Sequence, residues 1–184
     1  MSEGKETLPP AEIKAQGVLT NKGVKITERS SIDALSQRGY GIPEKSGLTL
    51  ALYEALFLVD KQALSVKDKK GVMKDFQSLL KAYEAVDENA WIRYLVYRDL
   101  RSRGYVVREG FGAAINFRIY ERGTYGKDTA ASLVLSTQEG QPLTLEDLTK
   151  ALVQTQSLKK DLVLAVMNRR GEIVYYSVSP LTFK

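Results

Sequence analysis

The side chains that could do chemistry in this sequence are restricted in kind. Its 184 residues include ten tyrosines, 27 lysines and arginines and 22 aspartates and glutamates, but no histidine and no cysteine. Histidine is the side chain whose unperturbed pKa lies near neutrality, so the usual proton carrier of metal-free catalysis is missing. Without cysteine there are no disulfides, thiolate ligands or thiol nucleophiles. A metal site would need carboxylate oxygens alone, and we expect neither a metal nor a cofactor.

The charge and hydropathy of the chain limit its partners only loosely. The net charge of +5 and the sequence pI near 9.3 fit a nucleic-acid partner, but they equally fit simple solubility. Residues 1–14 are polar and contain two prolines, without the apolar stretch of a signal peptide. The longest apolar run, residues 48–59, is shorter than the roughly 20 residues that span a bilayer. We therefore expect a soluble, cytoplasmic protein with no membrane contact.

The elements that must position any reactive group follow from periodicity and turn residues. In the first half, Asn21-Lys22-Gly23 lies inside an alternating pattern, which predicts a hairpin over residues 17–27. The spacing of apolar residues predicts a largely buried helix over 48–61 and a second helix over 72–83. A helical turn over 31–36 should precede a loop marked by Gly39, Gly41 and Pro43.

In the second half, Asp87 is the expected N-cap of a helix that ends before Gly104. The pattern then predicts strands at 105–108, 116–121 and 132–136. Thr144 and Asp147 resemble a capping box, so a helix through residue 155 should bury Leu145, Leu148, Ala151 and Leu152. Strands at 162–167 and 172–178 follow.

These elements predict an α+β protein in three parts. Residues 1–14 form a flexible tail and residues 15–85 a small N-terminal α/β domain. Residues 86–184 form a C-terminal domain in which helices flank a mixed sheet.

Four segments of the C-terminal half form a recognisable set in this order. They are YLVYRDLRSRGYVV (94–107), NFRIYERG (116–123), SLKKDLVLAV (157–166) and GEIVYYSV (171–178). Together they resemble the archaeal tRNA splicing endonuclease family. The N-terminal LTLALYEALFLVD (48–60) also looks like that family. The resemblance implies that the C-terminal sheet is nuclease-like.

The resemblance also implies a metal-free reaction that uses a tyrosine, a histidine and a lysine. The RNA 2′-hydroxyl attacks the adjacent phosphate, which leaves a 2′,3′-cyclic phosphate and a 5′-hydroxyl. Carried over onto this sequence, the tyrosine is Tyr120 and the lysine is Lys160. The histidine falls on Thr129 or its neighbour Asp128.

Neither residue at the histidine position replaces a histidine. A threonine hydroxyl does not donate a proton usefully near neutral pH, and an ordinary aspartate is already ionised and repels phosphate. The triad is therefore vestigial at Tyr120, Thr129 and Lys160. Without any catalytic role, Tyr120 is a packed strand tyrosine and Lys160 a solvated surface lysine.

The chain is accordingly expected to be a non-catalytic, structural subunit of a heteromeric endonuclease. The implied partners are a histidine-containing catalytic subunit, in a heterotetramer, and precursor tRNA with bulged-helix junctions. The residues expected to contact RNA are Arg118, Arg122, Lys127 and Lys160.

Family assembly uses the final strand and the loop before it. The residues expected at a subunit interface are Asn168, Arg169, Arg170, Gly171, Glu172, Val174, Tyr176 and Val178. The family loop is usually acidic, whereas this one is basic, so it docks on a complementary protein surface or on RNA phosphate.

Two other interpretations stay open at this stage. One is an active homo-oligomeric RNA endonuclease in which Asp128 carries the proton. The other is a stand-alone RNA-binding protein with no role in splicing.

Overall fold

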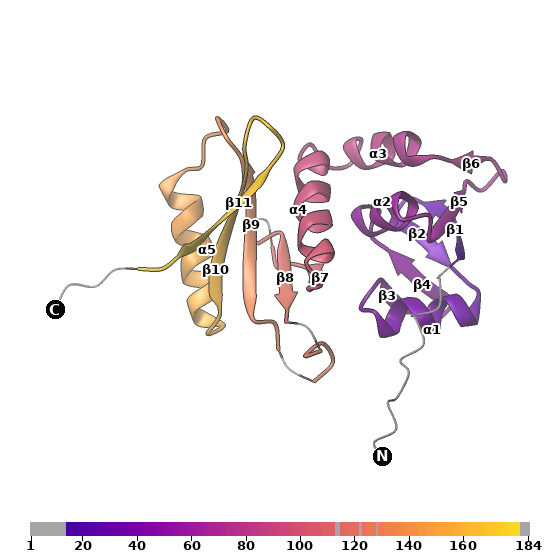
Figure 1. Ribbon diagram of the computed structural model, residues 1–184, viewed down its shortest axis with the longest axis horizontal. Helices are drawn as coiled ribbons and strands as arrows, with labels where there is room; N and C mark the ends of the chain where they lie inside the picture. Colours follow the sequence, from indigo (N-terminus) through magenta and orange to yellow (C-terminus); the bar gives the residue numbers. More distant parts are fainter. Residues whose placement is uncertain (1–13, 113–114, 122, 128, 181–184) are drawn as a thin grey trace, which may run out of the picture.

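The structure is a computed structural model that describes residues 14–112, 115–121, 123–127 and 129–180. Figure 1 shows its layers: a first sheet, a layer of helices, a second sheet and one outer helix. This arrangement confirms the predicted α+β class with a mixed C-terminal sheet flanked by helices.

The first sheet has six strands in the order β3-β4-β2-β1-β5-β6. Only β1 and β5 are parallel; the other neighbours are antiparallel. Helices α1 and α2 pack on this sheet, and α3 packs on α2. The elements are β1 (Ala15–Thr20), β2 (Gly23–Ile26), α1 (Arg29–Gln37), β3 (Ile42–Glu44), β4 (Gly47–Leu50), α2 (Leu52–Asp60), β5 (Leu64–Lys67), β6 (Met73–Lys74) and α3 (Phe76–Glu84).

The predicted hairpin is confirmed, since Val18 of β1 lies opposite Lys25 of β2. The predicted helix over 48–61 is wrong at its start. Residues 47–50 form strand β4, which is held between β2 and β3, and the helix begins only at Leu52. Likewise the helix over 72–83 begins late, because Asp75 caps it by accepting a hydrogen bond from the Ser78 amide. Sheet pairing overrode helical periodicity at both places.

The second sheet has five strands in the order β11-β10-β9-β8-β7. Only β9 and β10 are parallel, and α5 connects them. Helix α4 packs on one face of the sheet and α5 on the other (Figure 1). The elements are α4 (Ala90–Ser102), β7 (Val106–Glu109), β8 (Phe117–Tyr120), β9 (Ser132–Gln138), α5 (Leu145–Ser157), β10 (Asp161–Met167) and β11 (Ile173–Val178).

The order of elements predicted for the C-terminal half is confirmed, with two local corrections. Asn89, not Asp87, occupies the N-cap position of α4; Asp87 lies two residues earlier, and its carboxylate accepts from the Asn89 amide. Leu145, in the first turn of α5, is 82% exposed rather than buried. Thr144 does cap α5, accepting from the Asp147 amide.

The two sheets share one hydrophobic core. Tyr53 of α2 packs 4.9 Å from the Tyr97 ring of α4 and 5.3 Å from the Phe117 ring of β8. Tyr97 is also in edge contact with Phe57. A smaller, separate cluster around Leu133, Ala151 and Leu162 lies beneath α5. The aromatic rings therefore fix the second sheet against the N-terminal half.

A buried ion pair connects the same two parts of the chain. Arg108 of β7 donates to the carbonyl oxygens of Gly39 and Gly41 at 2.9 and 2.7 Å. Its guanidinium lies 3.5 Å from the carboxylate of Glu54, which is 4% exposed. Glu54 in turn accepts from the amides of Gly41 and Ala51.

Burial raises the pKa of Glu54, and the Arg108 charge and the two amide donors lower it in part. The carboxylate therefore depends on these partners to remain ionised inside the protein. A charge of this kind is costly when one partner is removed, because the other is left buried and uncompensated.

We predict that Arg108→Met lowers the free energy of unfolding by about 3–5 kcal/mol. Adding Glu54→Gln should recover part of that loss, because the stranded negative charge is gone. Urea unfolding followed by circular dichroism measures both effects. Lys150→Met is the control: its pair with Glu146 is 64% and 75% exposed, so the loss should stay below about 1 kcal/mol. Equal losses for Arg108→Met and Lys150→Met would contradict the prediction.

Candidate functional site

Lys160 and Thr129, which are 31 residues apart in sequence, are in direct contact. The Lys160 ammonium donates to the Thr129 hydroxyl at 2.6 Å. The parallel register of β9 and β10 explains the contact, because Ser132 lies beside Asp161 and brings the two strand starts together. The structure therefore brings Thr129, one of the two residues expected at the histidine position, next to Lys160.

The backbone conformation at the C-terminal end of α5 positions Lys160 beside Thr129. Lys159 has a left-handed backbone with φ of 53°. The amides of Lys159 and Lys160 donate to the carbonyls of Gln156 and Thr155, which is a Schellman arrangement. This reversal carries the chain from the helix directly into β10.

Tyr120 lies at the same end of the sheet. Ile119 of β8 is opposite Ser132, so Tyr120 comes level with Ala131 and with Lys160, two strands away. Neighbouring strands are about 4.8 Å apart, which separates the Tyr120 and Lys160 backbones by about 10 Å. Because Arg118 is opposite Leu133, whose side chain lies beneath α5, Arg118 and Tyr120 face the α5 side.

The Tyr120 ring is packed rather than free. It meets the Tyr125 ring edge-on, with centroids 5.1 Å apart. A Cβ at Gly39 would lie 3.2 Å from Cε1 of Tyr125 and 2.5 Å from Val106. Tyr125 therefore joins Tyr120 to the N-terminal half, a contact that the sequence pattern did not predict. The only signal is an aromatic residue in a glycine-rich loop.

Of the basic residues expected to contact RNA, the structure describes Arg118, Lys127 and Lys160. The Arg118 Nε donates to the Glu109 carbonyl at 2.8 Å, and its guanidinium lies 4.5 Å from the Phe111 ring centroid. Lys127 is exposed in the loop that follows Tyr125. Arg122 and Asp128 lie outside the described residues.

Chemically, the contact between Thr129 and Lys160 supplies a fixed cation and a hydroxyl. A lysine ammonium stabilises negative charge as it develops on a phosphate. The threonine hydroxyl accepts the lysine hydrogen bond and has no proton to deliver near neutral pH. The arrangement can hold a phosphate group, and of the two described side chains only the Lys160 ammonium carries a dissociable proton.

The final strand β11 has one open side within the described chain, since it pairs there with β10 alone. Tyr175 faces α4 and donates to Asp99 at 2.8 Å. Val174 and Tyr176 face the other way and are 42% and 52% exposed. Val178, on the same side, is half-buried.

The loop between β10 and β11 is folded back on itself. Asn168 accepts from the amides of Arg170 and Glu172, and its own amide donates to the Glu172 carboxylate at 2.7 Å. Arg169 lies 3.6 Å from Glu139. The acidic group of the loop is therefore engaged within the loop, whereas Arg169 and Arg170 are exposed.

Within the described residues, no group of three or more carboxylates, histidines or cysteines could hold a metal ion. In the same part of the chain, no helix is long and apolar enough to cross a membrane.

Comparison with known families agrees with this architecture. Residues 15–80 match the family model "tRNA intron endonuclease, N-terminal domain". Residues 90–175 match "tRNA intron endonuclease, catalytic C-terminal domain". The chain thus has the two domain types of a tRNA intron endonuclease.

Relatives along the whole chain give the same result. The tRNA-splicing endonuclease of Methanococcus vannielii is 33% identical over 181 residues, which are 98% of each chain. That of Pyrococcus horikoshii is 33% identical over 90% of this chain and 95% of its own. The Methanococcoides burtonii enzyme is 32% identical over 83% of this chain but only 43% of its own. This chain belongs to the tRNA intron endonuclease family.

Proposed function

We propose that the chain is a non-catalytic subunit of a heteromeric tRNA splicing endonuclease. The observation that carries the proposal is the contact between Thr129 and Lys160 in a chain without histidine. The proposed substrate is precursor tRNA, cut at bulged-helix junctions to leave 2′,3′-cyclic phosphate and 5′-hydroxyl ends. A histidine-bearing relative performs the cleavage, and this chain positions that relative and the RNA.

The missing step in this chain is protonation of the leaving oxygen. When the 2′-oxygen bonds to phosphorus, the bond from phosphorus to the 5′-oxygen breaks, and that oxygen needs a proton. Lys160 offsets charge on the phosphate, and Tyr120 lies at the same sheet end, but the residue in contact with Lys160 is a threonine. General acid catalysis contributes about 10²–10⁴-fold, so its loss alone suppresses cleavage.

The proposed interface is the open side of β11 with Val174, Tyr176 and Val178. An unpaired strand edge that presents apolar side chains is suited to pairing with another chain. The adjoining loop, Asn168 to Glu172, is basic on its exposed side, so it fits an acidic partner surface or RNA phosphate. We further propose that residues 15–85 and 86–184 are the two domains, with Arg118, Arg122, Lys127 and Lys160 at the RNA.

An active homo-oligomer is the second candidate function. The observation that favours it is the end-to-end match with the Methanococcus vannielii enzyme. The first experiment below separates the two candidates.

We expect this chain alone to leave an intron-containing precursor tRNA intact in buffer without metal. Mixed with a histidine-bearing relative from the same genome, it should give cleavage at both junctions. Gel analysis of end-labelled RNA measures both reactions, and the relative alone is the control. Cleavage by this chain alone would establish the active homo-oligomer instead.

We expect Thr129→His to give this chain cleavage activity of its own. The imidazole would stand where the threonine now meets Lys160 and would supply the missing proton, for a gain of about 10²–10⁴-fold over the wild-type chain. Thr129→Gln, similar in size but without a titratable proton, should give none. Single-turnover assays make the comparison. If both variants cleave equally, or neither exceeds wild type, the lost histidine does not explain inactivity.

We expect Tyr176→Lys to prevent assembly with the relative. A charge on the open side of β11 opposes strand pairing. Size-exclusion chromatography of the mixture should show two separate peaks, while the chain's unfolding midpoint stays near that of wild type. Val153→Lys, at a 59% exposed position on α5, is the control and should still co-elute. A Tyr176→Lys chain that co-elutes with the relative rules out this interface.

A further inference from the structure

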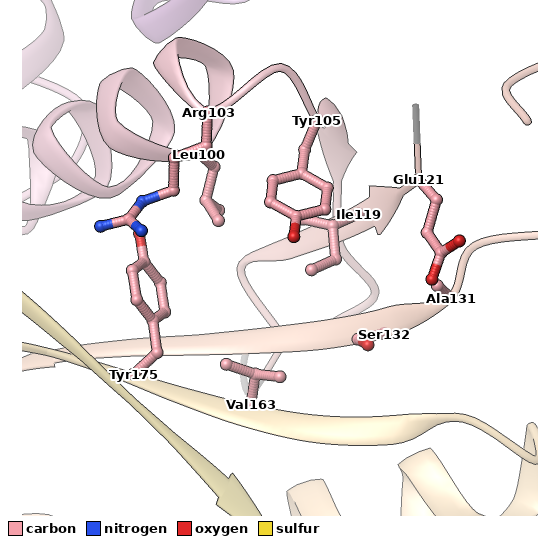
Figure 2. A pocket seen from close by; sticks show the side chains of 9 residues that line it. All are labelled: Leu100, Arg103, Tyr105, Ile119, Glu121, Ala131, Ser132, Val163 and Tyr175. Atoms are coloured by element: carbon pink, nitrogen blue, oxygen red, sulfur yellow. The ribbon is translucent and has the colours of Figure 1, made fainter. Parts of the chain in front are cut away.

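A pocket of about 320 Å³ lies between the end of α4 and the second sheet. Figure 2 shows its nine lining side chains, which come from α4, the strands and the turn after α4. The strand residues among them, Ile119, Ser132, Val163 and Tyr175, face the α4 side of the sheet, opposite the side that carries Tyr120. The lining residues are Leu100, Arg103, Tyr105, Ile119, Glu121, Ala131, Ser132, Val163 and Tyr175.

Two tyrosine rings and an aliphatic floor form the apolar part of the pocket. Tyr105 and Tyr175 project into it from different elements, and Ile119 and Val163 lie beneath them (Figure 2). The Tyr175 ring is held in place, because its hydroxyl donates to Asp99. The backbone of Tyr105 is fixed by its amide, which donates to the Leu100 carbonyl in the turn that ends α4. Such walls suit a flat aromatic ring.

Polar groups stand on two sides of this apolar floor. Arg103 lies beside Tyr175, with its guanidinium 5.5 Å from the ring centroid and its Nε donating to Asp99 at 2.7 Å. Glu121 lies on the other side, and its exposed carboxylate points toward Ala131 (Figure 2). Ser132 adds a half-buried hydroxyl. A ligand here meets acceptors at one edge and donors at the other.

We propose that this pocket binds an unstacked guanine base of the RNA. Unpaired bases are recognised by stacking on aromatic side chains and by hydrogen bonds to their Watson–Crick edges. A carboxylate has two acceptor oxygens and no donor, which matches the adjacent N1 and N2 donors of guanine. Uracil presents a single N–H between two carbonyls, which would face the same carboxylate unfavourably. The volume is at the small end of ligand pockets, in keeping with one nucleotide.

The position of the pocket connects it to the proposed RNA site, and the inference rests on that proposed function. Glu121 directly follows Tyr120, and Ala131 lies two residues after Thr129. Consecutive Cα atoms are about 3.8 Å apart, so one nucleotide can pass around the end of the sheet. A phosphate held by Lys160 would leave a neighbouring base within reach of the pocket.

The test is a titration of the full-length, isotope-labelled chain with guanosine 5′-monophosphate, followed by NMR. We expect saturable shifts at the amides of Tyr105, Glu121, Ser132 and Tyr175, with uridine 5′-monophosphate binding about tenfold more weakly. Glu121→Gln should abolish that preference, and Tyr105→Leu should weaken both nucleotides. Glu146→Gln on the exposed face of α5 is the matched control, and unfolding midpoints confirm that each variant folds.

Two results would overturn the proposal. The first is the absence of saturable shifts at the pocket at millimolar nucleotide. The second is the same shifts with ribose 5-phosphate, which would assign the pocket to phosphate on Arg103. The titration needs neither a partner nor cleavage. The two proposals can therefore fail separately. If the chain binds guanosine monophosphate but never supports precursor tRNA cleavage, the proposed function is wrong and the proposed base pocket stands.

Discussion

The structure depends on hydrogen bonds from two arginines in the second half of the chain to the backbone carbonyls of the loop at residues 38–41 in the first half. Arg108 donates to the carbonyls of Gly39 and Gly41, and Arg101 donates to that of Arg38 while stacking 3.9 Å from the Tyr40 ring centroid. Gly39 and Gly41 have φ of 73° and 67°, where a side chain would be strained. The loop can therefore take this shape only with glycines, and only this shape offers its carbonyls to arginine.

These arginine hydrogen bonds also affect the candidate functional site. Helix α4 carries Arg101 and leads into β7 with Arg108, so fixing both residues fixes the helix and the edge of the second sheet. Tyr125 then packs against Gly39 and meets Tyr120 edge-on. The sheet end that holds Tyr120, Thr129 and Lys160 is thereby tied to the N-terminal half. These contacts are made by packing alone, so they hold this end of the sheet in place whatever role its side chains have.

Much of the fold was predictable because local signals and tertiary contacts agree. The Asn21-Lys22-Gly23 turn, the Thr144 cap and the glycine after α4 all have the predicted roles. The predictions failed where contacts with other elements, rather than the local sequence, determine secondary structure or burial. Leu48 and Leu50 belong to an apolar run that suits a helix, yet strands on both sides offered hydrogen bonds, so β4 formed. Leu145 fits an apolar helical face, but the cluster beneath α5 takes in Leu148, Ala151 and Leu152 and leaves Leu145 exposed.

The sequence by itself determined that no histidine is available, because no fold can create one, and it determined the family through segments spread over the whole chain. Only the tertiary structure decided which residues meet. Thr129 reaches Lys160 because β9 and β10 run parallel in one register. The pocket of Tyr105, Glu121 and Tyr175 exists because the end of α4 and strands β8, β9, β10 and β11 converge there. Contacts between residues distant in sequence follow from strand order and register. The periodicity of side chains along a chain reveals neither the order nor the register.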